Sequence, residues 1–368
     1  MHHTGNPDNA QAKAPMRETG VAQVMTSTRF GKHPTAFTAT GLPILRLALD
    51  VAAMAPALLP LLAPLASGPE SAHLSYARLL AYKQGNRGTI RYDVEANGRP
   101  MTILGKLYPH PTQVARVHAI MKALWQDTFA ATPDLGVPRP LGTVPELSML
   151  VYVPVDGTPL DELLAGSEGP PAVEGTARWL SALHGADLEL DRRLHVATEV
   201  VNLQAWAALV SATYPEEGPV AARLAAGLTE NVGAIDARPE TPIHKDFHYK
   251  HVLVGSGVRV IDFDEVRHGD PMYDVAHFCA HLRLLACRSA DGAAAIANDE
   301  GRFLESYVGQ SGRSVDSSFP WYAAYTCLKI AKQLCSVRGV RPHPDGEEQD
   351  RQLSAMLQQG MAFRDLLR

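Results

Sequence analysis

Cysteine is scarce in this chain, and basic residues are not in excess. Four cysteines occur among 368 residues, and none belongs to a C-x-x-C pair. They form two pairs spaced by eight residues, which indicates thiols on helix faces, buried rather than bridged or metal-bound: Cys279, Cys287, Cys327 and Cys335. This usage fits a reduced, cytoplasmic setting. The formal net charge of −5 leaves no overall basic field to hold nucleic acid or an anionic membrane.

Long apolar segments are also lacking. A membrane-spanning helix needs about 20 consecutive apolar residues, and the apolar run at residues 51–66 is interrupted by Pro56, Pro60 and Pro64. We therefore expect a kinked helix that packs on the fold, and neither a membrane span nor a signal peptide. Residues 1–40 are rich in Gly, Pro, Asn, Thr and Ala without sustained periodicity, and we expect a flexible tail there.

Three common catalytic signatures are absent: G-x-S-x-G, G-x-x-x-x-G-K-[ST] and H-E-x-x-H. The sequence therefore gives no support for a hydrolase with a nucleophile elbow, a P-loop nucleotide-binding protein or a zinc metalloprotease. The composition, 46% hydrophobic and 20% charged, is typical of a globular protein, and the length suits two lobes or domains.

The first part of the chain has the pattern of a small mixed lobe. Residues 111–131 carry apolar residues at helical spacing. The dipeptide Asn97-Gly98 is a strong hairpin signal, so we expect an antiparallel meander around it. The expected strands are residues 76–83, 89–96, 100–108 and 148–154. After residue 153 the pattern becomes mainly helical, so the sequence predicts an α+β protein.

Polar residues able to carry chemistry are most concentrated at residues 243–274. Two short apolar strands, residues 252–254 and 258–261, flank a Gly-Ser-Gly turn, with a polar loop before and after the hairpin. The candidates in these loops are His244, Asp246, His248, His251, Asp262 and Asp264. Because the two loops lie at the ends of paired strands, we expect their polar side chains to lie close together. Phosphoryl transfer needs such a place, with one carboxylate to orient and deprotonate a hydroxyl and another to hold the metal ion that bridges the phosphates.

This segment resembles the aminoglycoside phosphotransferase family, which shares the protein-kinase fold. The family pattern H-G-D-x-H-x-x-N, I-D-[FW]-[DE] and G-D-P-x-x-D-[LV]-A appears here as H-K-D-F-H-Y-K-H, I-D-F-D and G-D-P-M-Y-D-V-A. The resemblance implies a protein-kinase-like bilobal fold with a small β-rich N-lobe and a larger helical C-lobe. Residues 41–153 would form the N-lobe, with a leading helix, nucleotide-covering strands and hinge. Residues 154–368 would form the C-lobe, with the catalytic loop, the metal-binding loop and the acceptor region.

The resemblance also implies roles for individual residues. Asp246 matches the catalytic base, and His248 belongs to the same catalytic motif. Asp262 matches the principal Mg²⁺ ligand, and Asp264 is a nearby acid that would help with metal or water. The implied reaction moves the γ-phosphoryl group of ATP to a hydroxyl of a small molecule. Asp270 and Asp274 match positions that brace the loop and the following helix.

Nucleotide contacts are implied upstream by the same resemblance. Gly85, Arg87 and Gly88 lie where the family has its phosphate-covering loop, although two glycines in a hairpin turn are as readily explained by the turn alone. Backbone amides in such a loop can cradle phosphates. Val151 and Val153 resemble the interlobe hinge, whose backbone would hydrogen-bond adenine.

Two departures from the family pattern affect the interpretation. His251 stands where the family has asparagine, a second metal ligand, so Mn²⁺ could replace Mg²⁺ if the imidazole binds the ion. Lys106 matches the lysine that pairs with the α- and β-phosphates, but the following helix has no glutamate to pair with it. The polar candidates for that partner are Gln113, His118 and Asp127. Both departures keep open a rival interpretation, a nucleotide-binding pseudokinase with weak or no activity.

The acceptor is only weakly indicated. Residues 286–368 contain as many acidic as basic residues, ten of each, which favours a neutral or less cationic acceptor over a polycationic aminoglycoside. His277 and His281 are four residues apart on a predicted helix, a spacing that can chelate zinc. No third ligand is evident nearby, so a packed pair is the better explanation. The sequence does not indicate an oligomeric state.

Overall fold

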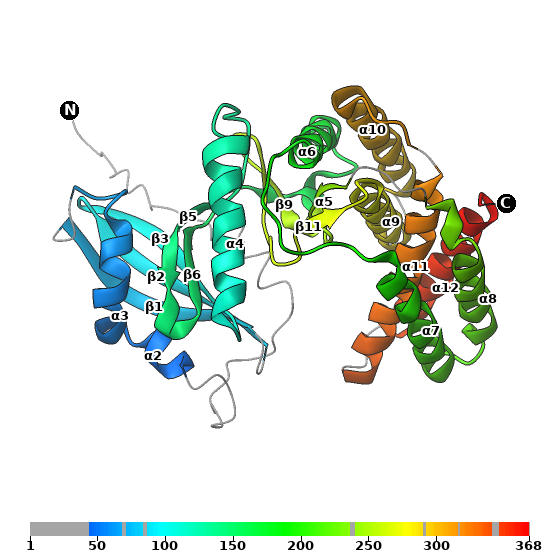
Figure 1. The fold of residues 1–368 in the computed structure, drawn as a ribbon, viewed down its shortest axis with the longest axis horizontal. Coiled ribbons are helices and arrows are strands. Elements are labelled where there is room, and N and C mark those ends of the chain that lie inside the picture. Colours follow the sequence, from blue (N-terminus) through cyan, green and yellow to red (C-terminus); the bar gives the residue numbers. More distant parts are fainter. Residues whose placement is uncertain are drawn as a thin grey trace, which may run out of the picture.

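A five-stranded antiparallel sheet forms the first part of the structure (Figure 1). The computed structural model describes residues 44–67, 71–83, 87–235, 240–289, 292–315, 317–340 and 346–367. The strand order is β1-β2-β3-β6-β5, and the bounds are β1 Ala72–Lys83, β2 Arg87–Ala96, β3 Arg99–Leu107, β5 Arg139–Val144 and β6 Met149–Val153. Asn97 and Gly98 join β2 and β3 with φ angles of 53° and 73°, the left-handed conformation that a tight hairpin requires. The predicted meander is therefore confirmed.

Helices cover both faces of this sheet. On one face, the segments α2 (Leu45–Leu49), α3 (Val51–Leu58) and η1 (Leu59–Leu62) pack on side chains such as Ile90 and Val151. Tyr92 reaches from the sheet and donates a hydrogen bond to the carbonyl of Ala48 at 2.6 Å. This is the kinked apolar segment expected from the sequence, with Pro56 inside α3. On the other face, α4 (Pro111–Ala123) packs along β5 and β6, and the π-turn η3 (Leu124–Thr128) continues from α4 toward α6.

Short strands and loops connect the sheet to the helical part. A four-stranded sheet has the order β4-β10-β9-β7, and a two-stranded sheet pairs β11 with β8. Their bounds are β4 Leu135–Gly136, β7 Thr158–Pro159, β8 Thr241–Ile243, β9 Val252–Val254, β10 Val258–Val260 and β11 Arg267–Gly269. The hairpin predicted around the Gly-Ser-Gly turn is present as β9 and β10, which pair antiparallel.

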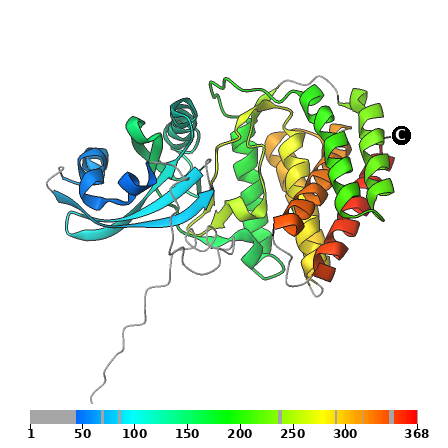
Figure 2. The same ribbon diagram turned by 90° about the horizontal axis from the view of Figure 1, so that it is seen from below.

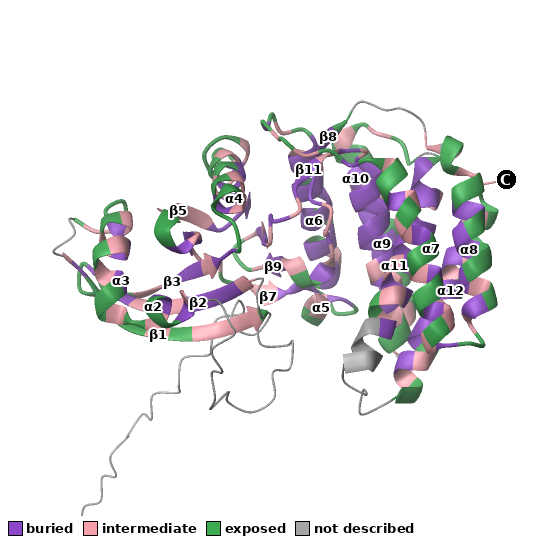
Figure 3. Ribbon diagram, turned by 60° about the horizontal axis from the view of Figure 1, so that its bottom comes forward, coloured by how far each residue is buried: buried purple, intermediate pink, exposed green. Residues whose placement is uncertain are grey.

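The rest of the chain is mainly helical, and its long helices pack side by side (Figure 2). The long helices are α6 Gly169–His184, α7 Val196–Thr213, α8 Gly218–Glu230, α9 Met272–Arg288, α10 Ala293–Ser311, α11 Ser318–Val340 and α12 Gly346–Asp365. The shorter ones are η4 Pro145–Leu147, α5 Leu160–Leu163, η5 Val232–Ala234 and η6 Tyr249–His251. Figure 3 shows buried residues concentrated on the inward faces of α6, α9 and α11. No helix in the described part of the chain is both long and apolar enough to cross a membrane.

The core of the helical part supports the loop that carries the predicted base. Trp179 of α6 is fully buried and stacks on Phe247 in that loop, with ring centroids 5.8 Å apart. Its indole Nε1 donates to the carbonyl of Gly136 at 2.9 Å, so one side chain connects α6, β4 and the loop. The four cysteines are free thiols on α9 and α11, three of them buried and Cys287 exposed.

Candidate active site

The loop between β8 and η6 is fixed to its surroundings by two buried side chains. His244 is fully buried, and its Nε2 lies 3.1 Å from the carbonyl oxygen of Ile261. Asp274 accepts hydrogen bonds from the backbone N–H groups of His244, at 2.6 Å, and Lys245, at 2.8 Å. The Asp274 carboxylate also lies 3.2 Å from Nε2 of His184. Because a buried carboxylate must be hydrogen-bonded to be tolerated, Asp274 fits the bracing role that the sequence suggested.

Lys245 stands where the family pattern has glycine. The backbone at this position has a conformation that glycine adopts more readily than other residues. Its φ is +67°, a left-handed conformation that costs a non-glycine residue about 1–2 kcal/mol. Besides the bond to Asp274, an ion pair holds Lys245 in this conformation, and its partner is itself held by a hydrogen bond. The ammonium of Lys245 lies 2.7 Å from Oε1 of Glu199, and the other Glu199 oxygen accepts from the hydroxyl of Tyr325. The substitution therefore connects the loop to α7 and α11.

Asp246 presents a partly exposed carboxylate that is surrounded by imidazoles. Its side chain is 37% exposed. Oδ1 lies 3.5 Å from Nε2 of His277, and Oδ2 lies 3.9 Å from both Nε2 of His248 and Nδ1 of His251. Burial would raise the pKa of Asp246, but the close imidazole of His277 and the other neighbouring histidines outweigh it and hold the pKa well below its usual range. Asp246 is therefore anionic at neutral pH and able to accept a hydrogen bond from a hydroxyl.

The histidines next to Asp246 are held neutral by their surroundings. Burial is the main cause that lowers the pKa of His277, to about 4, and it lowers the pKa of His248 and His281 as well. The rings of His277 and His281 lie 4.6 Å apart on α9, so they pack as a pair, as the sequence suggested, and they also face Asp246 and His248. At pH 7 these side chains act as hydrogen-bonding groups and not as cations.

Asp262 and His251 converge from the two loops. Asp262 has a φ of +69°, which turns its side chain out of the line of β10. Its Oδ1 accepts from Nζ of Lys106 at 2.9 Å, while its Oδ2 lies 3.8 Å from Nε2 of His251. Burial would raise the pKa of Asp262, but the charge of Lys106 lowers it below the ordinary value. A carboxylate oxygen of Asp262 therefore faces a ring nitrogen of His251.

The hydrogen bonds of the two loop histidines decide which of them suits a metal ion. Nδ1 of His251 lies 2.9 Å from the carbonyl oxygen of Asp246. A carbonyl only accepts, so Nδ1 carries a proton, and in the neutral form of the ring Nε2 has the lone pair, directed toward Asp262. In His248, Nδ1 accepts from the backbone N–H of Lys250 at 3.2 Å, so the proton of the neutral ring lies on Nε2. Asp262 and His251 thus fit a divalent cation. His248 fits one less well, although its spacing with Asp246 and His251, all within 4.8 Å, is compatible with a metal site.

Lys106 is paired with two carboxylates and with no residue of α4. Its Nζ lies 2.9 Å from Oδ1 of Asp262 and 2.9 Å from Oδ2 of Asp264. Burial would lower the pKa of Lys106, but these two carboxylates raise it well above its usual value. Asp264 is almost fully buried, and it also accepts from Tyr108 at 2.7 Å and from Arg87. Both of its oxygens are engaged, and through them Asp264 anchors Lys106. The metal or water role assigned to Asp264 stays a prediction.

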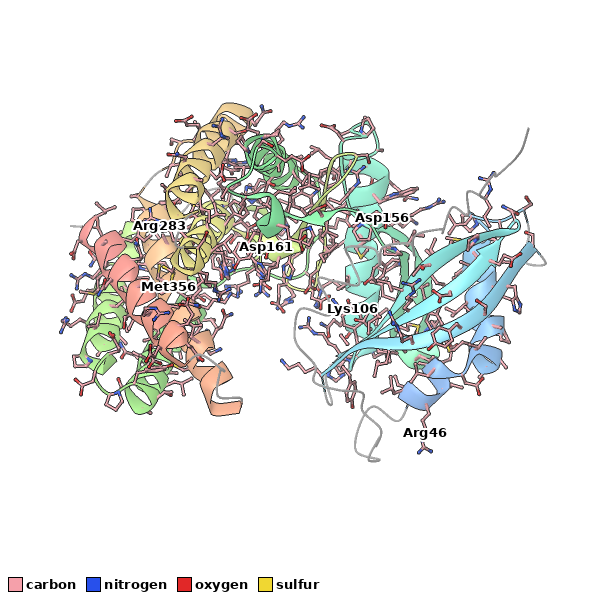
Figure 4. All side chains as sticks on the ribbon, turned by 180° about the vertical axis from the view of Figure 1, so that it is seen from behind. Arg46, Lys106, Asp156, Asp161, Arg283 and Met356 are labelled. Atoms are coloured by element: carbon pink, nitrogen blue, oxygen red, sulfur yellow. The ribbon has the colours of Figure 1, made fainter. Side chains whose placement is uncertain are left out.

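A cavity of about 710 Å³ opens between the sheet and these loops. Its apolar walls come from both lobes, and its polar end holds Lys106, Asp262 and His251. Figure 4 shows Lys106 at the end of the sheet that faces the helical part. Apolar walls with charged groups at one end suit a nucleotide, whose base is apolar on its faces and whose phosphates are anionic. The apolar walls include Ala81, Val117, Met121, Pro138, Leu150 and Ile261.

Only some of the residues predicted to contact the nucleotide line this cavity. Arg87 and Gly88 line it, while Gly85 lies outside the described residues. Val151 and Val153 lie in β6 but do not line the cavity, since the side chain of Val151 is buried on the opposite face of the sheet. Their neighbours Leu150, Tyr152, Pro154 and Val155 line it. The backbone contacts assigned to Val151 and Val153 stay a prediction.

Comparison with known proteins agrees with this geometry. A model of the phosphotransferase enzyme family matches residues 78–307, which is more than half of the chain. The chain belongs to this family. The resemblance inferred from the loop motifs is thereby confirmed, as is the α+β kinase-like fold. A comparison with curated proteins found no match.

Several solved structures have a fold similar to that of this chain. A proposed aminoglycoside phosphotransferase from Ralstonia eutropha is similar with a TM-score of 0.60 and 17% identity, covering 84% of this chain and 98% of the other. Spectinomycin phosphotransferase, solved with ADP and spectinomycin, is similar with a TM-score of 0.53 and 12% identity, over 84% and 98%. A choline/ethanolamine kinase family protein from Mesorhizobium loti has a TM-score of 0.52 and 16% identity, over 75% and 90%. At these identities the likeness establishes the fold alone.

Two residues of the site were not found from the sequence. Tyr108 lies two residues after Lys106, directly after the end of β3, and donates a hydrogen bond to Asp264; the alternation of side chains along an extended segment could have placed both on one face. His277 lies one helical turn after Asp274 on α9, a spacing that directs both toward the same loop. The described structure shows no hydrogen bond or ion pair from Lys106 to the candidates Gln113, His118 or Asp127.

Proposed function

We propose that this phosphotransferase moves the γ-phosphoryl group of ATP to a hydroxyl group of a small molecule. The observation that carries the proposal is the convergence of Asp246 and Asp262. His251 lies between them, 3.9 Å from one carboxylate and 3.8 Å from the other, at the charged end of the cavity. One carboxylate is open to an acceptor, and the other is held by Lys106 where phosphates would lie.

Each side chain has a task in this reaction. Asp246 accepts a hydrogen bond from the acceptor hydroxyl, aims its oxygen at the γ-phosphorus and takes up its proton as the new O–P bond forms. The bond from the γ-phosphorus to the bridging oxygen breaks, and ADP leaves with that oxygen. The low pKa of Asp246 makes orientation its larger contribution, since it is a weak proton acceptor. Lys106 stabilises the negative charge of the phosphates, as do the backbone and side chain of the Arg87 region.

Asp262 and His251 would hold a divalent cation, Mg²⁺ or Mn²⁺, whose charge would offset that of the phosphates. Support for a nucleotide comes from the cavity and from spectinomycin phosphotransferase, which was solved with ADP. We assign residues 41–153 to the nucleotide-covering lobe and residues 154–368 to the lobe that receives the acceptor. A cytoplasmic location stays a prediction.

The rival function, a nucleotide-binding pseudokinase, is favoured by one observation. Lys106 is occupied by Asp262 and Asp264, and α4 offers no glutamate to it. Turnover of ATP with a panel of hydroxylated metabolites and antibiotics separates the two functions. We expect acceptor-dependent release of ADP together with a phosphorylated product detected by mass spectrometry. Tight Mg²⁺-ATP binding without any acceptor-dependent turnover would instead establish the pseudokinase.

A further inference from the structure

His277 of α9 lies close to the proposed base, and one of its ring nitrogens is unpaired. The ring is fully buried, and its Nε2 lies 3.5 Å from Oδ1 of Asp246. Among the described residues, no hydrogen-bond partner reaches this buried nitrogen. Leaving a buried polar atom unpaired destabilises the folded state. A nitrogen that is kept there and faces a carboxylate therefore indicates a function for the contact.

The two oxygens of the Asp246 carboxylate have different surroundings. Oδ1 faces His277, which is not among the residues that line the cavity. Oδ2 lies 3.9 Å from both His248 and His251, which do line it. All three distances are longer than the roughly 2.7–3.2 Å of an ordinary N–H···O hydrogen bond. Oδ2 is therefore the oxygen on the side of an incoming hydroxyl, and no close hydrogen bond yet fixes the carboxylate.

The neighbours of His277 determine which of its nitrogens carries the proton. Burial lowers the pKa of His277 to about 4, so the ring is neutral at pH 7 and has one N–H group. The carboxylate of Asp246 only accepts, which favours the proton on Nε2 and a lone pair on Nδ1. On the other side of the ring, Oγ1 of Thr326 lies 3.5 Å from Nδ1. A hydroxyl donates readily to such a lone pair.

Thr326 of α11 is available for this bond. A threonine inside a helix often donates to the carbonyl of the preceding turn, as Thr176 does to Ala172 at 2.8 Å. Within the part of the chain that the structure describes, Thr326 has its hydrogen bond with His277 instead. Its side chain is fully buried, so the hydroxyl depends on this partner. Figure 1 shows α9 and α11 next to each other, and their packing maintains the contact.

We propose that His277 positions Asp246 for phosphoryl transfer: when the acceptor binds, Nε2–H of His277 donates to Oδ1 of Asp246, and Oδ2 accepts the hydroxyl of the acceptor. Thr326 fixes the tautomer of His277 by donating to Nδ1. The inference rests on the proposed phosphotransferase function, and it goes further by naming two residues that orient the base. Catalytic hydrogen bonds are often long in the absence of substrate and shorten in the complex.

The benefit of this hydrogen bond lies in orientation and not in basicity. A hydrogen bond to the ionised carboxylate stabilises it and makes Asp246 a weaker proton acceptor. It also holds the carboxylate so that Oδ2 meets the hydroxyl in one geometry, and such positioning contributes strongly to rate. His277 acts through Asp246 and does not touch the transferred group.

Matched substitutions separate the donor at Nε2 from the bulk of the ring. His277→Leu removes both nitrogens. His277→Gln places an amide N–H near the position of Nε2, whereas His277→Asn, one methylene shorter, places it near that of Nδ1. Thr326→Val removes the hydroxyl at nearly constant shape, and Thr326→Ser keeps it. Cys279→Ala is the control, because it changes another fully buried side chain of α9.

The expected effects are on kcat, measured with an acceptor that the wild type phosphorylates. In His277→Leu and His277→Asn kcat should fall about tenfold to hundredfold, the size expected for a hydrogen bond to a charged group. His277→Gln and Cys279→Ala should stay within about threefold of the wild type. Thr326→Val should lower kcat about twofold to tenfold, the size of a hydrogen bond between neutral groups, and Thr326→Ser should lower it less. KM for ATP should change by less than about threefold in the His277 variants, since His277 does not line the cavity.

The tautomer of His277 is observable without turnover. In protein labelled with ¹⁵N-histidine, two-bond couplings between nitrogen and hydrogen identify the protonated ring nitrogen. The signals of His277 are those that disappear in His277→Gln. At pH 7 we expect the proton on Nε2, and an Nδ1 signal that shifts in Thr326→Val.

The outcomes separate this inference from the function on which it rests. A proton on Nδ1, equal kcat values for the wild type and His277→Leu, or equal values for His277→Gln and His277→Asn would overturn the positioning role and leave the phosphotransferase in place. A fall of kcat in Cys279→Ala as large as in His277→Leu would also overturn it, because any change in α9 would then have the same effect. Absence of turnover by the wild type with every acceptor would refute the phosphotransferase, and the positioning role with it.

Discussion

The ion pairs around Asp264 make the stability of the folded chain depend on one buried carboxylate. Asp264 is 2% exposed and receives Lys106 at 2.9 Å, Tyr108 at 2.7 Å and Arg87. Asp264→Asn keeps the shape of the side chain but removes its charge. Lys106, which is 12% exposed, would then rely on Asp262 alone. Breaking a buried ion pair from one side typically costs about 3–5 kcal/mol because the partner charge stays buried.

The expected cost is smaller than that full range. Lys106 keeps one carboxylate at 2.9 Å, and the side chain of Arg87 is 34% exposed and can return to water. We therefore expect Asp264→Asn to lower the free energy of unfolding by about 2–3 kcal/mol. Tyr108→Phe removes one hydrogen bond from the same carboxylate and should cost about 1–1.5 kcal/mol. Arg87→Gln should lower the free energy of unfolding by less than about 1 kcal/mol, because the guanidinium of Arg87 is partly open to solvent and ion pairs that solvent reaches are weak.

Urea unfolding at pH 7 without nucleotide measures these differences, with linear extrapolation to water. The ranking tests the structure more sharply than any single value. If Asp264→Asn changed the free energy of unfolding by less than about 0.5 kcal/mol, or by less than Tyr108→Phe, the carboxylate would not be the centre of this network.

Three further predictions concern the imidazoles and the proposed metal ligand. Burial lowers the pKa of His277 from 6.5 to about 4, so between these values the unfolded chain binds a proton that the folded chain refuses. The free energy of unfolding should therefore fall by about 2 kcal/mol more between pH 7 and pH 5 in the wild type than in His277→Gln. If the free energy of unfolding changed equally with pH in both proteins, His277 would not be a buried neutral imidazole. For His251→Asn, we expect a smaller ratio of Mn²⁺-supported to Mg²⁺-supported turnover, because the imidazole nitrogen suits Mn²⁺ better than the amide oxygen does. Identical metal ratios in the two proteins would exclude His251 as a ligand. Asp262→Ala should weaken Mg²⁺-ATP binding at least tenfold, roughly the effect of losing a hard carboxylate ligand, and unchanged affinity in calorimetry would remove it from the metal site.

Local patterns in the sequence were sufficient to predict much of the fold. The alternation of side chains and the Asn97-Gly98 turn predicted the meander of β1, β2 and β3, because each strand pairs with its neighbour in the chain. Prolines in an apolar run predicted the kinked segment that includes α3. The spacing of polar residues around the β9–β10 hairpin predicted that Asp246, His251 and Asp262 would meet, and they do.

The features that the sequence did not predict depend on contacts between segments that are far apart in the chain. Arg87 and Asp264 are 177 residues apart, and no local period signals that they pair. The family pattern points to the following helix for the partner of Lys106, whereas the structure supplies Asp264 from the loop after β10. Thr326 of α11 lies 3.5 Å from His277 of α9, a contact that only the packing of these two helices brings about. Such placements follow from tertiary packing, which sequence periodicity does not encode.

The central claim is that Asp246 acts directly on the acceptor hydroxyl, and Asp246→Asn tests it most directly. The variant keeps the size of the side chain and its place among the histidines. With an acceptor that the wild type phosphorylates, we expect turnover to fall about 10²–10⁴-fold, while calorimetry shows ATP affinity within about threefold of wild type, because Asp246 does not hold the nucleotide. Turnover within about threefold of wild type would contradict the claim.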